Sequence, residues 1–319
     1  MKNARHILVT GGAGFIGSHL VERLLHGGES VVVIDDFSTG SLENLRAVKK
    51  NPRLKIIHSK ISKCKNLPKL AADSEFIFHL AATVGVELVV KSALHVLESS
   101  FHETEILLRA AAKNSAPVLL ASTSEVYGKS AKAEFSEDDD LLIGPPNQSR
   151  WSYASAKLTD EFLALACARE KKLPVIIARL FNTVGPRQTG RYGMVLPRFI
   201  AAAKKNEPLK VFGDGNQTRC FCLVNDVVES LVRLQNCEKA LGEIFNVGGT
   251  EEISILDLAK LVVRTLGSKS KIELIPYDQA YAPGFNDMRR RKPLVEKLER
   301  FVKFKPQTPL REIIRLTAN

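Results

Sequence analysis

The first half of the chain alternates short apolar runs with longer amphipathic segments. The apolar runs have the length of buried strands and lie at residues 7–10, 31–35, 54–57, 76–81, 117–123 and 174–181. Between them, apolar residues recur at helical spacing, which predicts helices at 17–27, 98–114 and 152–171. This alternation is typical of a doubly wound α/β fold, in which helices cover both faces of a parallel sheet.

The pattern changes after residue 182, where strands and helices become shorter and loops longer. Further elements are predicted at 195–206 (helix), 209–212 (strand), 244–248 (strand), 254–266 (helix) and 309–317 (helix). We therefore expect a first domain at 1–182 and a smaller C-terminal lobe at 183–319. Residues 222–248 could return to the first sheet, in which case the two domains are interleaved.

A glycine-rich segment joins the first strand to the first helix. Gly11, Gly14 and Gly17 follow the spacing G-x-x-G-x-x-G, which places backbone N–H groups and a helix N-terminus against a pyrophosphate, as in Rossmann folds. The second strand ends in Asp35-Asp36, eighteen residues after Gly17. An acidic side chain there accepts hydrogen bonds from ribose hydroxyls and repels a 2′-phosphate, so NAD is predicted rather than NADP.

Tyr153 and Lys157 lie four residues apart, one turn along the same predicted helix. An ammonium beside a phenol favours the phenolate, so the tyrosine could act as a base below its free pKa of about 10. Such a base can take a proton from a sugar hydroxyl while hydride leaves the carbon. The spacing alone also fits a surface lysine beside a packed tyrosine, because many helices carry it by chance.

The composition of the chain limits the kinds of partner that the protein can bind. The chain of 319 residues has a net charge of +11, but its basic residues are spread and no aromatic-interleaved basic stripe occurs. We therefore expect attraction of an anionic metabolite, and neither a nucleic-acid partner nor a membrane partner. The five cysteines show no metal or disulfide spacing, which favours reduced thiols and no metal site. Without an apolar run of eighteen residues, we expect a cytoplasmic protein.

The chain resembles the extended short-chain dehydrogenase/reductase family, in particular its NAD-dependent nucleotide-sugar epimerases, dehydratases and decarboxylases. Besides the tyrosine–lysine pair, the resemblance rests on Thr10–Gly17, His79–Ala82, Ser122–Gly128, Arg179–Asn182, Gly185–Arg187, Gly213–Gly215, Gln217–Arg219 and Asn246–Gly248. It implies a UDP-sugar substrate whose C4 is oxidised to a ketone by bound NAD. It also implies a homodimer formed through the helices at 98–114 and 152–171.

The resemblance also implies roles for individual residues. The residues implied for catalysis are Thr123, Glu125, Tyr153, Lys157 and Arg291. Those implied for the cofactor are Gly11, Gly14, Phe15, Ile16, Gly17, Asp35, Ala81, Tyr153 and Lys157. Those implied for the nucleotide sugar are Arg150, Asn182, Leu196, Arg198, Arg219 and Arg291.

A 4-keto sugar can lose a carboxylate, accept hydride on its other face, or lose water. Glu125 is typical of the decarboxylases and dehydratases, and arginines at the positions of Arg150 and Arg291 face the glucuronyl carboxylate in the decarboxylases. The motif Gly284-Phe285-Asn286-Asp287 belongs to the same branch. The resemblance therefore favours a UDP-glucuronate decarboxylase of the UDP-xylose synthase kind. The main alternative is a 4-epimerase of UDP-glucose or UDP-glucuronate. A 4,6-dehydratase is the next alternative.

Three residues depart from the pattern of the family. Lys60 stands where an aspartate usually contacts adenine, Ser100 replaces an asparagine, and Glu103 replaces a glycine. A lysine cannot accept the adenine hydrogen bond, so weaker NAD binding is expected. These departures keep open a further alternative, a catalytically silent NAD-binding protein.

Overall fold

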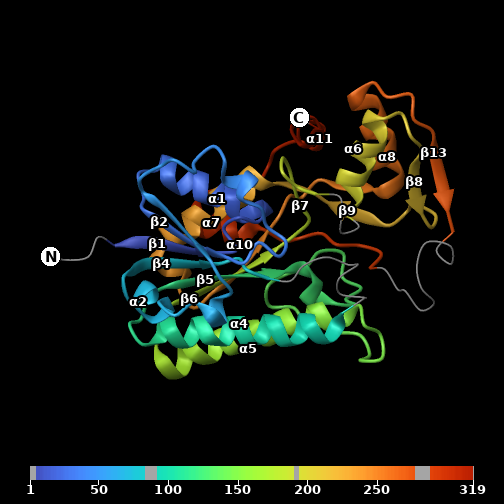
Figure 1. The fold of residues 1–319 in the computed structure, drawn as a ribbon. Helices are drawn as coiled ribbons and strands as arrows, with labels where there is room; N and C mark the ends of the chain where they lie inside the picture. The colour runs from blue at the N-terminus through green and yellow to red at the C-terminus, as the bar shows by residue number, and fades with distance from the viewer. Residues whose placement is uncertain (1–4, 83–91, 190–193, 277–287, 319) are drawn as a thin grey trace.

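A seven-stranded parallel sheet forms the centre of the computed structural model, which describes residues 5–82, 92–189, 194–276 and 288–318 (Figure 1). Its strand order is β11-β6-β5-β4-β1-β2-β3. The strands are β1 (His6–Thr10), β2 (Val31–Asp35), β3 (Leu54–His58), β4 (Ser74–His79), β5 (Val118–Thr123), β6 (Val175–Leu180) and β11 (Ile244–Val247). Every neighbouring pair is parallel, which confirms the predicted α/β class.

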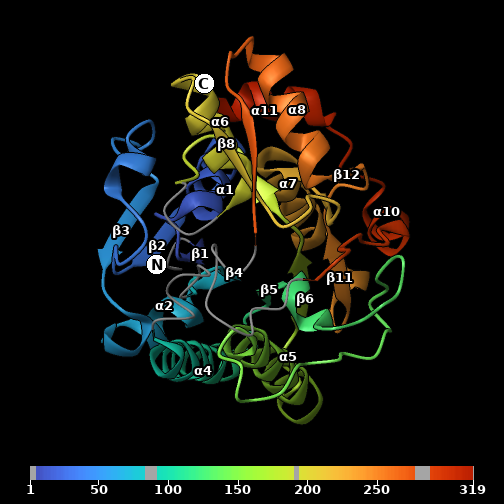
Figure 2. The same cartoon turned by 90° about the vertical axis from the view of Figure 1, so that its right-hand side faces the viewer.

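Helices cover both faces of this sheet (Figures 1 and 2). One layer contains α1 (Phe15–His26), α7 (Val224–Gln235) and α10 (Glu296–Val302), and the other contains α2 (Leu67–Ala72), α4 (Ala93–Ala112) and α5 (Trp151–Lys171). In β1, Ile7 and Val9 face the first layer and Leu8 faces the second. Because both faces are buried in the centre of the sheet, β1 and β2 are nearly continuous apolar runs, whereas the edge strand β3 is only partly buried.

A smaller lobe lies beyond the carboxyl ends of the strands. It contains α6 (Val195–Lys204), α8 (Ile255–Leu266), α11 (Leu310–Ala318), and the strand pairs β7 (Thr183–Val184) with β10 (Cys222–Leu223), β8 (Leu209–Phe212) with β13 (Ile272–Ile275), and β9 (Thr218–Cys220) with β12 (Glu252–Ser254). Leu196, Val211, Leu258 and Ile313 share its separate hydrophobic core. Short 3₁₀ helices complete the chain at η1 (Leu42–Leu45), η2 (Ile61–Lys63), η3 (Ser124–Tyr127) and η5 (Glu238–Ala240).

Residues 222–248 contribute to both regions. Strand β10 pairs with β7, whereas α7 packs on α1 and β11 pairs with β6 in the main sheet. The division of the chain at residue 182 stays a prediction. The sequence reading did not recognise α7, although its buried residues 224, 227, 228, 231 and 234 have helical spacing.

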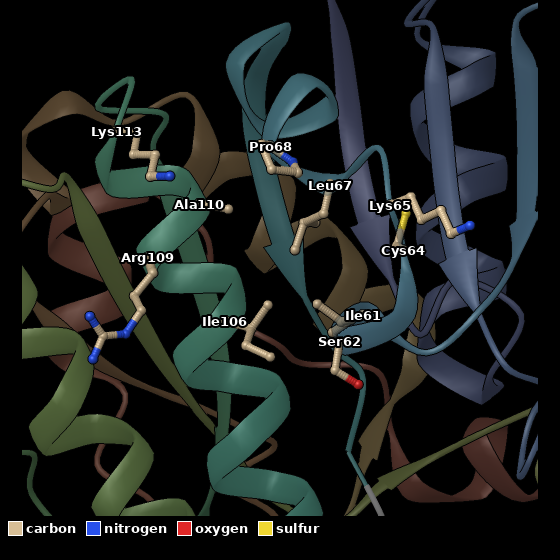
Figure 3. A pocket seen from close by; sticks show the side chains of 10 residues that line it. All are labelled: Ile61, Ser62, Cys64, Lys65, Leu67, Pro68, Ile106, Arg109, Ala110 and Lys113. Carbon is tan, nitrogen blue, oxygen red and sulfur yellow. The ribbon is translucent and has the colours of Figure 1, made fainter.

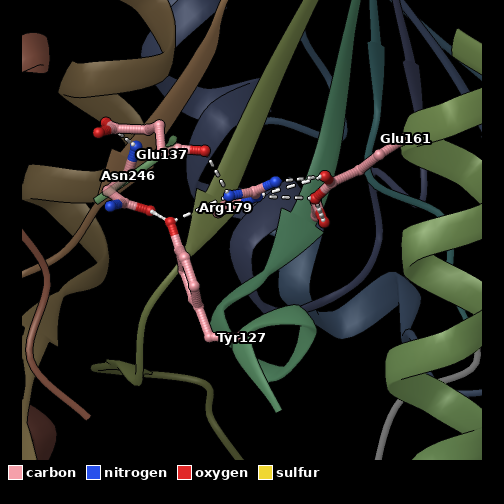
Figure 4. Close-up of polar contacts among 6 residues, drawn as sticks. Tyr127, Glu137, Glu161, Arg179 and Asn246 are labelled. Atoms are coloured by element: carbon pink, nitrogen blue, oxygen red, sulfur yellow. Dashed lines mark hydrogen bonds and ion pairs between the residues drawn. The ribbon is translucent and has the colours of Figure 1, made fainter. Parts of the chain in front are cut away.

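A buried polar network joins the sheet to α5 at the level of the strand ends (Figure 4). Arg179 on β6 lies 2.8 Å from Glu161 on α5, and each side chain is only 3% exposed. Arg179 also donates to the Tyr127 hydroxyl at 3.1 Å, and that hydroxyl donates to Asn246 on β11 at 2.7 Å. The backbone N–H of Asn246 donates to Glu137 at 2.8 Å. The network therefore fixes α5 relative to three neighbouring segments.

Glu161→Gln tests this network, because it leaves the buried guanidinium of Arg179 without its counter-charge. We expect the free energy of unfolding to fall by about 3–5 kcal/mol, measured by urea denaturation. The control is Glu105→Gln, which breaks the more exposed pair with Arg109 on α4. That change should cost no more than about 0.5 kcal/mol. Equal losses in the two variants would contradict a supporting role for the network.

Candidate active site

The glycine turn after β1 forms a cradle, a backbone turn with no room for side chains at its glycine positions. Gly11 has φ +71°, and a Cβ atom added there would lie 2.7 Å from the backbone nitrogen of Ala81. A Cβ atom on Gly17 would lie 2.1 Å from the carbonyl oxygen of Gly11. Helix α1 begins at Phe15, followed by Ile16, and no side chain caps its N-terminus at Gly14. These bare N–H groups fit a pyrophosphate.

Asp35 ties this turn to the end of β2. Its carboxylate accepts from the backbone nitrogens of Ala13 and Phe37, both at 2.8 Å. Burial raises the pKa of Asp35, and these two hydrogen bonds only partly offset it. A carboxylate has about four acceptor positions, so two are left for ribose hydroxyls. The residues of the turn and of β2 therefore fit NAD.

The three departures from the family pattern have polar neighbours in the structure. Glu103 on α4 accepts from the backbone nitrogen and the hydroxyl of Ser62, at 2.8 and 2.6 Å, and so fastens η2 to α4. Ser100 donates to Asp160 on α5 at 2.9 Å. Burial alone would raise the pKa of Asp36, but hydrogen bonds from Ser38 and the charge of Lys60 lower it. Weaker NAD binding stays a prediction.

The structure brings Thr123 at the end of β5 together with Tyr153 on α5, since the two side chains share a hydrogen bond. Lys157 is 2% exposed, and its ammonium donates to Asp160 at 2.9 Å. Burial raises the pKa of Tyr153, as do the charges of Glu125 and Asp160. The sequence predicted a lowered pKa. The direction is opposite mainly because the phenol is buried, and the negative charges of Glu125 and Asp160 raise its pKa further.

Glu125, in η3, lies among the arginines predicted for the substrate. Its carboxylate is 2.8 Å from Arg291 and 3.7 Å from Arg150, and it also feels the charge of Arg219. Burial alone would raise the pKa of Glu125, but these charges lower it, Arg291 most. Three guanidinium groups and one carboxylate leave two net positive charges, which suits an anionic substrate. The buried Nε atom of Arg291 has no hydrogen-bond partner among the described residues.

The remaining predicted substrate residues lie in or beside the smaller lobe. Asn182 donates to the carbonyl oxygen of Cys220 at 2.9 Å. The side chain of Leu196 is buried in the core of that lobe, so only its backbone could meet a nucleotide. Arg198 lies over the ring of Phe212, 4.2 Å from its centroid. Residues 190–193 and the Gly284–Asp287 motif lie outside the described residues, and the roles of all these residues stay predictions.

Two buried residues of the site were given no role from the sequence, although His79 belongs to the His79–Ala82 motif. Asp160 follows Lys157 by three residues, and that spacing on a buried helix face was the available signal. His79 at the end of β4 bonds to the hydroxyls of Thr10 and Thr104, at 2.8 and 3.0 Å. Burial and the charge of Lys157 lower the pKa of His79 to about 3, so the ring is neutral.

A separate groove lies between α2 and α4, lined in part by Cys64, Leu67, Arg109 and Lys113 (Figure 3). It contains none of the predicted site residues. Within the described ranges, no cluster of three or more histidine, cysteine or acidic residues could hold a metal ion. In the same ranges, no helix is long and apolar enough to span a membrane.

Comparison with known proteins agrees with this geometry. Residues 7–248 match the NAD dependent epimerase/dehydratase family. The chain is 42% identical to a UDP-N-acetyl-alpha-D-glucosaminuronate decarboxylase of Bacillus cytotoxicus, over 95% of this chain and 93% of the relative. It is 35% identical to UDP-glucuronic acid decarboxylase 4 of Arabidopsis thaliana, over 98% of this chain and 67% of the relative.

Among solved structures, it resembles a UDP-glucuronic acid 4-epimerase of Bacillus cereus in complex with UDP-glucuronic acid and NAD. The TM-score is 0.87 with 30% identity, over 98% of each chain. The protein belongs to the NAD dependent epimerase/dehydratase family and is an enzyme that uses NAD.

Gly17→Ala tests the cradle. The added methyl group would overlap the Gly11 carbonyl, and relieving such overpacking costs about 1–3 kcal/mol. We expect NAD affinity to fall about tenfold or more, measured by isothermal titration calorimetry. The control is Gly27→Ala at the other end of α1, where φ is −73° and the nearest atom is 3.3 Å away. Unchanged affinity in Gly17→Ala would contradict the cradle.

Proposed function

We propose that the protein decarboxylates a UDP-uronate through a 4-keto intermediate. The observation that carries this proposal is the cluster of Arg291, Arg150 and Glu125 beside Tyr153. With Arg219 close by, the cluster carries two net positive charges, which suit a sugar that bears a carboxylate. The related decarboxylases act on uronates by their names, and the chain aligns with the Bacillus relative over nearly its whole length.

Tyr153 takes the proton of the sugar C4 hydroxyl, and Thr123 holds the phenol by a hydrogen bond. NAD, held by the glycine turn and Asp35, would supply the hydride acceptor and donor at C4. The arginines hold the carboxylate, and CO₂ leaves once C4 is a ketone because the electron pair passes into the enolate at C5. The enolate takes a proton from water at C5, and when hydride returns to C4, Tyr153 returns its own proton to the C4 oxygen.

A second candidate is 4-epimerisation of a UDP-uronate, which shares the 4-keto sugar but keeps the carboxylate. It is supported by the similar structure of a UDP-glucuronic acid 4-epimerase. UDP-glucuronate and UDP-N-acetylglucosaminuronate are the candidate substrates, on the names of the relatives. The assignment of uracil as the base of the nucleotide also rests on the names of these relatives.

The deciding assay incubates the NAD-loaded enzyme with each of these two uronates and follows CO₂ and the sugar product. We expect CO₂ release with a sugar shortened by one carbon. Arg291→Met should lower kcat/KM about 30-fold or more, because truncating one partner of a buried charge pair costs about 2–5 kcal/mol. Tyr153→Phe should abolish turnover while UDP binding persists.

Arg290→Met is the matched control, because Arg290 is 46% exposed and pairs with Glu252. Its effect should be less than about fivefold. If the product is a hexuronate epimer of unchanged mass, the proposed decarboxylation is wrong and epimerisation is the function. Full activity of Tyr153→Phe would overturn the assigned base.

We also propose a homodimer formed through α4 and α5. Three apolar side chains are exposed along one face of α4, Leu94, Leu97 and Phe101, and Phe162 on α5 is 64% exposed. The two helices pack against each other in the same layer (Figure 1). A group of exposed apolar side chains on one face is typical of a protein interface. The cytoplasmic location stays a prediction from the sequence.

Phe162→Glu tests the dimer by placing a charge in the proposed interface. We expect the molar mass in size-exclusion chromatography with light scattering to fall from that of two chains to that of one. Leu274→Glu on β13 of the smaller lobe is the control, since Leu274 is 54% exposed. A mass of one chain in the unaltered protein would contradict the dimer.

A further inference from the structure

Lys157, the lysine assigned to the reaction, forms a buried ion pair with Asp160. Asp160 lies three residues after Lys157 on α5 and is 0% exposed. One oxygen, Oδ2, accepts from the Lys157 ammonium at 2.9 Å and from the Ser100 hydroxyl of α4 at 2.9 Å. The other oxygen, Oδ1, is buried without a hydrogen-bond partner among the described residues.

A purely structural explanation for this pair is weak. Taking two charges out of water costs several kcal/mol per ion, and well-packed apolar residues often serve as well or better. Helices α4 and α5 already share extensive contact, with Ala164, Leu107 and Leu108 in a common apolar core. The ion pair also involves the one lysine that is assigned to the reaction.

We propose that Asp160 is a positioning residue that fixes the Lys157 ammonium, balances its charge, and thereby sets the ionisation of Tyr153. Ser100 holds the carboxylate from the neighbouring helix. This inference rests on Tyr153 being the base of the proposed function. It explains why Ser100, a departure from the family pattern, lies opposite an acid.

The charged groups around the pair come from four elements. Glu125 in η3 pairs with Arg291 and Arg150, and its charge still raises the pKa of Tyr153. His79 on β4 faces Lys157 and is neutral. The next acid on α5, Glu161, is paired with Arg179 on β6 and not with the lysine.

Asp160 is therefore the acid that pairs with Lys157. Its charge raises the pKa of Tyr153, after burial and Glu125 in order of size.

Asp160→Asn is the central test, because asparagine keeps the shape and can still accept from Lys157 and Ser100. Removing the negative charge leaves the ammonium uncompensated, so the phenolate of Tyr153 is favoured. We expect the pKa of Tyr153 to fall by about 1–3 units. The measurement is ultraviolet difference titration of the NAD-loaded protein, with the matching Tyr153→Phe variant subtracted to isolate this phenol from the other four of the five tyrosines.

Ser100→Ala is the matched control, since it removes a hydrogen bond to Asp160 but keeps the charge. Its Tyr153 should begin to ionise at nearly the same pH as in the unaltered protein. A residue that serves only for packing would change the stability in both variants and the titration in neither. Asp160→Ser supplies a second neutral side chain if Asp160→Asn does not fold, as judged by circular dichroism.

The rate gives an independent reading. Below the pKa of its base, activity rises with pH, so the rising limb for Asp160→Asn should move to lower pH by the same amount. An unchanged or raised onset of phenol ionisation in the folded neutral variants would overturn the inference. The titration needs no turnover, so failure of the proposed function would show separately, as absence of activity in the unaltered enzyme.

Discussion

The buried ion pair between Glu161 and Arg179 is the constraint on which the site depends. It joins α5 to β6 in the interior, and the hydroxyl of Tyr127 extends the connection to β11. Because α5 is held there, the side chains one and two turns earlier are held as well. Tyr153 and Lys157 therefore meet the end of β5 with little freedom to shift. None of the side chains of the network belongs to the proposed reaction, yet the network fixes the orientation of the helix that carries Tyr153 and Lys157.

The two acids that follow Lys157 have different tasks. Glu161 points toward the sheet and supports the fold, whereas Asp160 points toward α4 and receives the ammonium. Adjacent positions on a helix are separated by about 100°, so one helix can serve two layers. In the same way, η3 contributes to two groups of residues: Tyr127 belongs to the supporting network, and Glu125 belongs to the arginine cluster.

The sequence predicted the main sheet well because its central strands are buried on both faces and so are nearly uniformly apolar. The glycine turn and Asp35 could be located for a similar reason, since backbone geometry permits few alternatives there. The short strands β9, β12 and β13 were not recognised. Three or four residues carry too little pattern to separate a strand from a loop, unless a turn follows them, as Gly213–Gly215 follows β8.

The electrostatics of the site could not be derived in the same way. Tyr153 and Lys157 were recognised by spacing, but the pKa of the phenol is raised first by burial, then by Glu125 and Asp160. The partner of Asp160, Ser100, comes from a helix sixty residues earlier. Such long-range pairing is not encoded in a local pattern. Arg291 and Glu125 could be assigned only through kinship, because 166 positions separate them in the chain.

The return of β11 to the main sheet has a consequence for synthesis of the chain. The last strand of that sheet follows β8 and β9 of the smaller lobe, so the ribosome releases it late. Until residue 247 has emerged, β6 has an unpaired edge, and such an edge invites pairing with another nascent chain. The main sheet is therefore complete only after β11 has been synthesised. Until then, the exposed edge of β6 must be protected while the chain folds on the ribosome.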